Sequence, residues 1–460
     1  MSSDDDQVII EAGYQPQLRR SLGLFSSFAV SFSFISITTG IFANYGYVLG
    51  KAGPFGFWTW LLVGAGHTLV ALVFAELAGR MPLTGAAYNW NIKLMGPAVG
   101  WFTGWLALSA YSIGVAAVTS TLVPVVGTIF DTQFNPALTT DITVGVILLQ
   151  TLINIFGVRL TSKINLIAVY AELISIAVLG CLIAVMALHH GQLHFDLLTT
   201  IPAQPRPYLP GFLMACLLGA WAFVGFETSA DMSEETINAR KIAPKGVISS
   251  IAVSAILGFF FIVAMTVAIP DVKEVTSAEN PLIAIVNYHL GAAATKIFMV
   301  FVVIAIFACS LLNMTAASRI LYAIARDRRF VVSSLFQKIS AQRVPVIAIG
   351  FVSATAILFT LLADSLTALY SGTSILAALL YAFTVIGFAV GFKKLPPTHT
   401  FSLGRWRWPV VGLAISWMLF ELGILTIPED FHSGALAAGI VVITGFVPYL
   451  VSGRKRRLEA

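Results

Sequence analysis

The sequence predicts an all-α polytopic membrane protein with twelve transmembrane helices, on the evidence of its composition and its long apolar runs. Of the 460 residues, 58% are hydrophobic and only 11% are charged, whereas soluble globular domains carry about 25% charged residues. A hydrocarbon core about 30 Å thick takes roughly 20 apolar residues per crossing helix. Backbone in lipid must satisfy its own hydrogen bonds, and long unbroken apolar runs favour helices over a closed barrel. The composition excludes a soluble enzyme.

Apolar runs separated by charged or Pro/Gly-rich breaks define the predicted helices. In chain order, they cover residues 22–49, 55–79, 97–126, 140–158, 163–188, 210–231, 246–269, 295–324, 344–363, 366–391, 408–427 and 433–452. Residues 1–20 are expected to form a disordered cytoplasmic tail, and a second short tail follows at 453–460. The lipid bilayer is therefore an expected partner of most of the chain.

The distribution of basic residues predicts the orientation. With the N-terminus inside, all but four of the 27 Lys and Arg residues fall in cytoplasmic segments, the exceptions being Lys51, Arg206, Lys273 and Lys296. Cytoplasmic loops of membrane proteins carry such an excess of basic residues. We therefore expect a multi-pass protein of the cell inner (cytoplasmic) membrane with both termini cytoplasmic. The net charge of +5 follows from this rule and requires no nucleic-acid partner.

The first and sixth predicted spans are interrupted by polar residues and glycine at mid-membrane depth. The first reads FISITTGIFANYG and the sixth reads WAFVGFET. Interruptions at matching positions of two halves point to an inverted-repeat transporter and to its binding site. The alternative for either segment alone is close helix packing, for which Gly, Ser and Thr are also used. Their joint occurrence, five spans apart, favours a site.

Five motifs in chain order resemble the amino acid–polyamine–organocation superfamily of permeases. They are ISITTGIF in the first span, FAELAGRMPLTGAAYNW leaving the second, GPAVGWFTGW in the third, FVGFETSADMSEETINARKIAPKG after the sixth and AASRILYAIARDRRF ending the eighth. Together they cover roughly residues 18–395. The opening GYQPQLRRSLGLFSSFAVSFSFISITTGIF looks most like the branch that includes choline, 4-aminobutyrate and related amino acid permeases.

The resemblance implies a leucine-transporter-type fold, with a five-plus-five inverted repeat and two extra helices. The first repeat would hold helices 1–5 in residues 21–190, and the second would hold helices 6–10 in residues 210–392. An external loop at 191–209 would separate them, and helices 11 and 12 would follow in residues 393–452. In this family the substrate lies between the broken first and sixth helices, where the interruptions already point.

The residue types at the two breaks predict what each would bind. A half-helix that restarts after Gly40 would point its N-terminal N–H groups at a substrate carboxylate. The unwound sixth span would offer backbone carbonyls to an ammonium group, since broken backbone leaves acceptors without helical partners. The predicted substrate-binding residues of these segments are Ser36, Ile37, Thr38, Thr39, Gly40, Ala222, Phe223 and Val224.

Two more substrate-binding residues are implied by the resemblance. Trp221 occupies the position at which the family commonly places a gating aromatic over the substrate. There it would shield a cation with its π face or fill volume as the site closes. Asn313 falls where related transporters place a substrate-side residue. The alternatives are packing or interface anchoring for Trp221 and an interhelical hydrogen bond for Asn313.

Glu227 and Glu172 are the predicted coupling residues, because an ionisable side chain inside a span is costly and is a functional candidate by default. Glu227 matches a family acid directly after the sixth-helix break, with scaffolding of that break as the alternative. At the position of Glu172, many proton-coupled members have a lysine that stands in for sodium. An acid there would titrate, attract a cation or face a polar packing site. We expect Glu172 to be the more remote of the two from the substrate.

The predicted function is secondary active transport of a small amino acid or an amino-acid-derived amine by alternating access, and H⁺ is the predicted coupling ion. The alternatives are transport of choline, ethanolamine or a polyamine, or substrate exchange on the same fold. A nutrient sensor is disfavoured by the short tails, and a channel is disfavoured by the bulky Trp221. The sequence has no Walker loop, HExxH or nucleophile elbow, so we expect no enzyme activity, no cofactor and no metal.

Two smaller predictions concern residues outside the proposed site. Glu234 and Glu235 lie in a charged connection after the sixth span and are expected to pair with Arg240 and other basic residues of the loop. Cys309 lies within an apolar run without metal-type spacing and is expected to serve in packing.

Overall fold

Helices build the part of the chain that the structure describes. The computed structural model describes residues 4–11, 13–15, 17–18, 20–201, 207–398 and 400–459. Within those ranges the only β-type pairing is an isolated bridge between Leu22 and Thr236.

The long apolar elements include three helix pairs. These elements are α2 (Leu24–Ile35) with α3 (Ile37–Ala52), α4 (Trp58–Arg80), α6 (Pro97–Ile129), α7 (Pro136–Ile155), α8 (Val158–His189), α9 (Tyr208–Ala215) with α10 (Leu217–Ala222), α12 (Ala239–Val267), α14 (Pro281–Arg326), α16 (Val346–Leu362), α17 (Leu366–Gly391), α18 (Arg407–Thr426), and α19 (His432–Thr444) with α20 (Phe446–Glu459). Shorter helices and 3-10 turns are α1 (Asp4–Glu11), α5 (Ala86–Met95), α11 (Thr228–Asp231), α13 (Val272–Ser277), α15 (Ser333–Phe336), η1 (Pro54–Phe57), η2 (Phe195–Leu198), η3 (Ser233–Glu235), η4 (Phe392–Lys394), η5 (Gly404–Trp406) and η6 (Glu429–Phe431).

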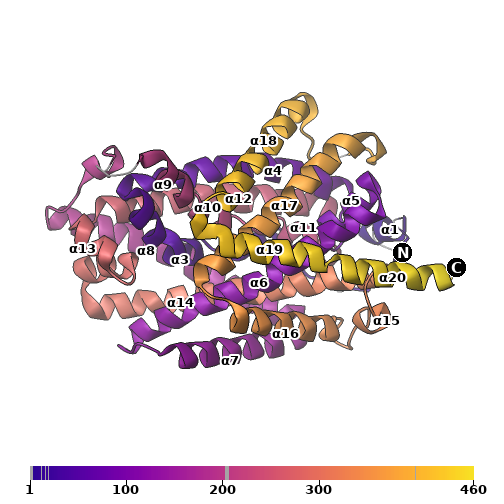
Figure 1. The fold of residues 1–460 in the computed structure, drawn as a ribbon, viewed down its shortest axis with the longest axis horizontal. Helices are drawn as coiled ribbons and strands as arrows, with labels where there is room; N and C mark the ends of the chain where they lie inside the picture. Colours follow the sequence, from indigo (N-terminus) through magenta and orange to yellow (C-terminus); the bar gives the residue numbers. More distant parts are fainter. Residues whose placement is uncertain are drawn as a thin grey trace.

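Ten helical stretches of the described chain are long and apolar enough to cross a membrane, and two shorter apolar stretches cover Tyr208–Ala222 and Val346–Leu362. This agrees with the predicted all-α polytopic membrane protein. The helices run mainly along the long axis of the molecule, with α1 and α20 at one end and α13 at the other (Figure 1). We call these ends the termini side and the far side.

Several boundaries differ from the sequence prediction. The eighth long helix, α14, begins at Pro281 rather than at 295, because Gly291 (φ 76°, ψ 169°) lets the chain kink and continue as helix. The connecting helix α5 was not predicted. The prediction of a disordered N-terminal tail was wrong for residues 4–11, which form α1, and the side chain of Ile9 is buried.

The helices form an inner and an outer set. In the apolar 18-residue window of each helix, the buried share is 78% in α2 with α3 and 72% in α6, but only 22% in α7. The outer helices expose large apolar side chains such as Leu152 on α7, Ile174 on α8 and Leu361 on α16. Extended exposed apolar surface of this kind marks contact with a membrane.

Two inner helices are broken where they cross the bundle. α2 ends and α3 begins at Ser36, whose φ of 38° is rare for a residue with a side chain. Residues 223–227 are unwound between α10 and α11, and Gly225 there has a φ of 92°. A Cβ atom at Gly225 would lie 1.9 Å from the ring of Phe34, so only glycine fits at this crossing of the two breaks.

The restart of the first broken helix was predicted after Gly40, and this was wrong. α3 begins at Ile37, so Gly40 lies inside its first turns. The close neighbour of Gly40 is α10, because a Cβ atom at this position would lie 2.5 Å from Cβ of Ala222. Gly40 therefore sets how closely the two broken helices approach each other.

On the termini side, η3 joins the N-terminal segment to α14. The backbone N–H of Leu22 donates to the carbonyl of Glu235 (3.0 Å), and that of Ile237 donates back to Leu22 (2.9 Å). The Glu235 carboxylate also accepts from Nε of Arg319 at 2.9 Å, and both side chains are buried. Removing one partner of such a buried pair costs about 3–5 kcal/mol.

The neighbouring carboxylate, that of Glu234, adds a second ion pair between η3 and α14. Glu234 accepts from Nη1 of Arg326 (2.9 Å) and from the backbone N–H of Thr84 (3.0 Å). The guanidinium of Arg326 lies 3.9 Å above the Tyr14 ring, and burial together with Asp327 raises the pKa of Tyr14. The expected pairing of these glutamates with Arg240 was wrong. Arg319 and Arg326 are seven residues apart on one face of α14. Arg319 pairs with Glu235, and Arg326 pairs with Glu234.

We expect Gly40→Ala to destabilise the protein by about 1–3 kcal/mol, because overpacking a tight contact forces backbone or side-chain shifts. Gly50→Ala is the matched control, since a Cβ atom at Gly50 in the same helix meets nothing within 4 Å. Thermal unfolding of the purified variants measures the effect. Equal unfolding midpoints for the two variants would contradict this prediction, because the close contact with Ala222 would then have no effect on stability.

Candidate functional site

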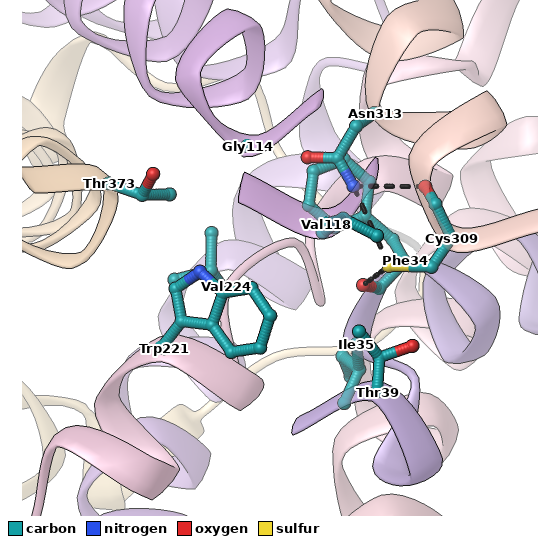
Figure 2. A pocket seen from close by; sticks show the side chains of 10 residues that line it. All are labelled: Phe34, Ile35, Thr39, Gly114, Val118, Trp221, Val224, Cys309, Asn313 and Thr373. Atoms are coloured by element: carbon teal, nitrogen blue, oxygen red, sulfur yellow. Dashed lines mark hydrogen bonds between the residues drawn. The ribbon is translucent and has the colours of Figure 1, made fainter. Parts of the chain in front are cut away.

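A small cavity lies where the two breaks meet α6, α14 and α17 (Figure 2). Its free volume is about 20 Å³, which is room for about one water molecule. The residues that line it are Phe34, Ile35, Thr39, Gly114, Val118, Trp221, Val224, Cys309, Asn313 and Thr373. All ten lining residues are buried, so the cavity is occluded, and any larger ligand requires its walls to move apart.

The ten residues predicted to bind substrate divide into two groups. Thr39, Trp221, Val224 and Asn313 line the cavity. Ser36, Ile37, Thr38, Gly40, Ala222 and Phe223 are the residues of the same segments that lie outside its lining. Successive residues of a helix point in directions about 100° apart, so a segment can reach a cavity with only some of its side chains.

Several lining residues were missed by sequence reasoning. Cys309 was expected to serve in packing, yet its Sγ lies in the wall and donates to the carbonyl of Phe34 at 3.1 Å. It lies one helical turn before Asn313, whose Nδ2 donates to the Cys309 carbonyl at 3.0 Å. Gly114 leaves space for the Asn313 amide oxygen, which would lie 2.4 Å from a Cβ atom there. The i−4 spacing from Asn313 was the available signal for Cys309.

The N-terminus of α3 is occupied by the side chain of Glu172 from α8. Its Oε1 accepts the backbone N–H of Thr38 at 2.9 Å and the hydroxyl of Ser36 at 3.0 Å. Glu172 is fully buried. Glu172 thus contacts two of the residues predicted to bind substrate, because α8 packs directly against the first break.

Trp221 and Tyr370 separate the small cavity from a wider one. Their ring centroids are 4.4 Å apart, and the Tyr370 hydroxyl is held by Thr121 at 2.7 Å. Tyr370 also lines a second cavity of about 640 Å³ on the far side, together with Gly46 and Glu279. The aromatic pair is therefore the partition between a wide far-side cavity and the occluded one.

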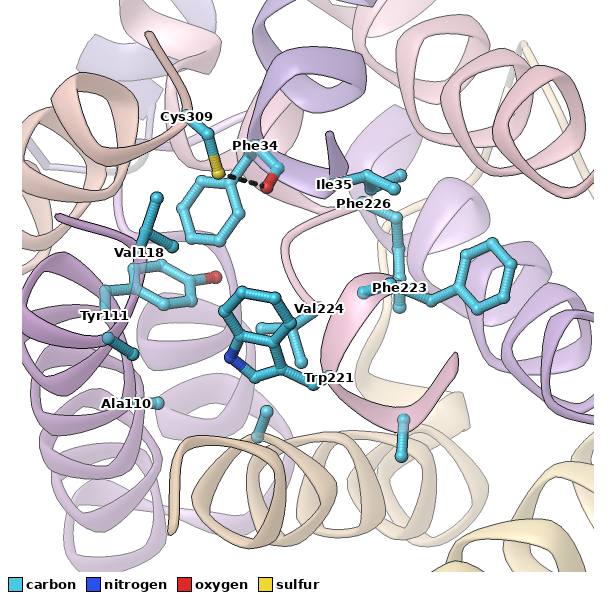
Figure 3. Close-up of a cluster of buried hydrophobic side chains, with 14 of the residues drawn as sticks. Phe34, Ile35, Ala110, Tyr111, Val118, Trp221, Phe223, Val224, Phe226 and Cys309 are labelled. Atoms are coloured by element: carbon cyan, nitrogen blue, oxygen red, sulfur yellow. Dashed lines mark hydrogen bonds between the residues drawn. The ribbon is translucent and has the colours of Figure 1, made fainter. Parts of the chain in front are cut away.

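The unwound segment places its aromatic side chains away from the small cavity. Phe223 packs on Trp60 of α4, with 4.5 Å between ring centroids, and Phe226 packs on Tyr381 of α17 at 4.9 Å. In Figure 3 the Trp221, Phe34 and Tyr111 side chains lie together, and the side chain of Phe223 points away from them. Within the described chain, no hydrogen bond ends on the carbonyl oxygens of Ala222, Phe223 or Val224. Of these three residues, Val224 lines the cavity.

Glu227 closes the second break through two tyrosines. Tyr381 accepts the backbone N–H of Gly225 at 3.0 Å and donates its own proton to Glu227 Oε2 at 2.9 Å. Tyr111 of α6 donates to Glu227 Oε1. Glu227 is buried and accepts from two phenols, so it holds the unwound backbone against α6 and α17.

Asp231 is a second buried acid that sequence reasoning missed. Its Oδ2 lies 3.3 Å from the same Tyr111 hydroxyl, and the side chain is 3% exposed. Asp231 follows Glu227 by four residues, which puts both acids on one face of a helical segment. That spacing was the available signal. The two acids therefore meet at one phenol.

Comparison with known proteins finds a matching family and several relatives. A family model described as amino acid permease matches residues 22–447. The amino-acid permease BAT1 of Arabidopsis thaliana is 27% identical, over 96% of this chain and 93% of its own. Its homolog in Oryza sativa subsp. japonica is also 27% identical, over 92% and 87%. The thiamine transporter thi9 of Schizosaccharomyces pombe is 23% identical, over 96% and 84%. The predicted resemblance is confirmed.

We expect Trp221→Ala to open the partition and expose Cys309 to thiol reagents from the far side. Each 1.4 kcal/mol of lost packing corresponds to about tenfold in the open population, and a buried Trp→Ala change costs about 3–5 kcal/mol. The rate of labelling by a small methanethiosulfonate, with Cys181 and Cys216 replaced by Ser, measures the effect and should rise at least about tenfold.

Trp60→Ala is the matched control for this experiment. It removes a ring of equal size from the opposite side of the unwound segment, where Trp60 packs on Phe223. Labelling of Cys309 should stay at the parent rate in this variant. Equal labelling in both tryptophan variants would contradict the partition.

Proposed function

Because the chain belongs to the amino acid permease family, we propose that it is a secondary active transporter of a small amino acid or an amine derived from one. The observation that carries the proposal is the occluded cavity at the meeting point of two broken helices. Broken helices at mid-membrane depth are the usual place for a transporter to hold its solute. The relatives described as amino-acid permeases and as a thiamine transporter support a nitrogen-containing small molecule as the substrate.

The proposed topology has twelve crossings. The ten long apolar helices and the two shorter stretches together supply that number. One helix of each predicted repeat, α2 with α3 and α10 with α11, is broken, which supports the five-plus-five inverted repeat with two added helices. The excess of basic residues in the loops on the termini side supports a cytoplasmic location of both termini, and we propose the cell inner membrane as the membrane.

Alternating access needs one closed barrier on each side of the cavity. On the termini side, the ion pairs of Glu234 and Glu235 with α14 form one barrier. On the far side, Trp221 and Tyr370 form a thinner barrier below the wide cavity. In this conformation the site is one aromatic pair away from the far-side solution. If the ion-paired barrier opened and the far side closed, the site would become accessible from the termini side.

The acids at the second break support proton coupling. The Tyr111 hydroxyl has one proton, and it donates that proton to Glu227. The same hydroxyl also lies within donating distance of Asp231 Oδ2, at 3.3 Å. One phenol proton cannot serve two carboxylates fully, so a further proton on one of the two acids would complete the hydrogen bonds of the group. No Lys or Arg of the described chain forms an ion pair with either acid. We propose that Glu227 and Asp231 share the transported proton next to the backbone that holds substrate.

Saturable uptake and countertransport in proteoliposomes test the transport function itself. A transporter accumulates labelled substrate and exchanges it against unlabelled substrate, whereas a sensor binds without flux and a channel does not saturate. Absence of flux with a ligand that binds the purified protein would reject transport.

We expect Glu227→Gln and Asp231→Asn to abolish proton-driven accumulation, so that the internal substrate concentration stops at equilibrium. Substrate exchange should survive, because neutral amides imitate the protonated acids. Pyranine trapped inside liposomes reports the substrate-induced proton flux. Glu421→Gln changes a buried acid on α18 and should keep wild-type acidification. Wild-type acidification in both Glu227→Gln and Asp231→Asn would reject coupling through this pair.

A further inference from the structure

The N–H groups at the start of α3 already have a carboxyl acceptor, and the protein supplies it. The first N–H groups of a helix lack internal partners and attract negative charge. Here the carboxyl group of Glu172 accepts hydrogen bonds from the N–H of Thr38 at 2.9 Å and from the hydroxyl of Ser36 at 3.0 Å. This is the place where a substrate carboxylate was expected from the sequence.

Glu172 is connected to the cavity wall by a short chain of hydroxyls. Thr39 lines the cavity, and its hydroxyl lies 2.7 Å from Ser36 Oγ, which in turn donates to Glu172. The second carboxylate oxygen of Glu172, Oε2, is buried and has no hydrogen-bond partner within the described chain, and the same holds for the hydroxyl of Thr38. An unpartnered buried carboxylate oxygen is costly, and a cation nearby would relieve that cost.

The charges around the cavity are of one sign. None of its lining residues is charged. Two buried acids, Glu172 and Glu227, flank it at the two breaks, and in the described chain neither pairs with Lys or Arg. The nearest buried base on α14, Arg319, is already paired with Glu235. Like charges repel strongly where water is excluded, so a ligand carboxylate finds no counter-charge here.

We propose that this site selects organic cations that lack a carboxylate, and that Glu172 is the residue that sets this preference. The inference rests on the proposed function, whose substrate class it narrows from amino acids and amines to cationic amines. Trp221 provides a π face for the cation, and Val224, which also lines the cavity, has a backbone carbonyl without a hydrogen bond in the described chain. A zwitterion would have to displace Glu172 from Thr38 before its own carboxylate could bind.

Matched pairs of small molecules test the preference on the purified full-length protein. The pairs are choline with glycine betaine, ethanolamine with glycine, and putrescine with 4-aminobutyrate, and in each pair the second member carries the carboxylate. Thermal-shift titration gives the apparent affinity of each compound. We expect the cation to bind at least about tenfold tighter than its partner in every pair that responds. Equal or tighter binding of the zwitterions, or no response to any of the cations, overturns the proposal.

Glu172→Gln tests the residue itself. The Gln side-chain oxygen can still accept the N–H of Thr38, so the break keeps its cap while the charge is lost. We expect the affinity for the cations to fall at least about tenfold and the cation-to-zwitterion ratio to fall toward one. Glu421→Gln is the matched control, because it removes a fully buried acid that caps no helix, and it should keep the wild-type ratio. An unchanged ratio in folded Glu172→Gln overturns the assignment.

Flux measurements separate this inference from the proposed function. Cation-selective binding without uptake into proteoliposomes would reject transport and leave the assignment of Glu172 intact. Uptake of glycine or 4-aminobutyrate with no preference for the cations would keep transport and reject the assignment.

Discussion

A helix that breaks inside a membrane leaves N–H and C=O groups that lipid cannot satisfy, and the way this chain satisfies them determines much of its structure. At the first break, Glu172 and Ser36 accept the N–H groups of Thr38 and Thr39. At the second break, Tyr381 accepts a hydrogen bond from the N–H of Gly225 and donates one to Glu227. Each break is thus tied to a helix other than its own, α8 in one case and α17 in the other. Within the described residues, the carbonyls of residues 222–224 at the second break accept no hydrogen bond.

The features that could be predicted from the sequence are those encoded locally. Apolar runs give the helical membrane class, and polar or glycine residues within a run mark the two breaks. The point at which α3 restarts could not be predicted, because it depends on a hydrogen bond between Thr38 and Glu172, which are 134 residues apart. The partners of Glu234 and Glu235 were missed for the same reason, since α14 is remote in sequence but adjacent in space.

The candidate site shows the same division at the scale of single side chains. The sequence indicates which segments meet, but the face that each residue presents follows from packing. Thr39 therefore lines the cavity while its neighbours Thr38 and Gly40 do not. Asp231 carried a readable signal in its spacing from Glu227. Thr373 carried none, because nothing in its own stretch of helix distinguishes a wall residue from a packing residue.

The unequal sizes of the two cavities have a consequence for hydration. A volume of about 640 Å³ on the far side corresponds to on the order of twenty molecules of liquid water, at about 30 Å³ each. The occluded cavity has room for about one. In the proposed alternation of access, closure of the far-side cavity would expel most of that water into the bulk solution. The equilibrium between the two proposed conformations would then depend on water activity, so that a solute too large to enter the far-side cavity would shift it by osmotic stress without touching the binding site.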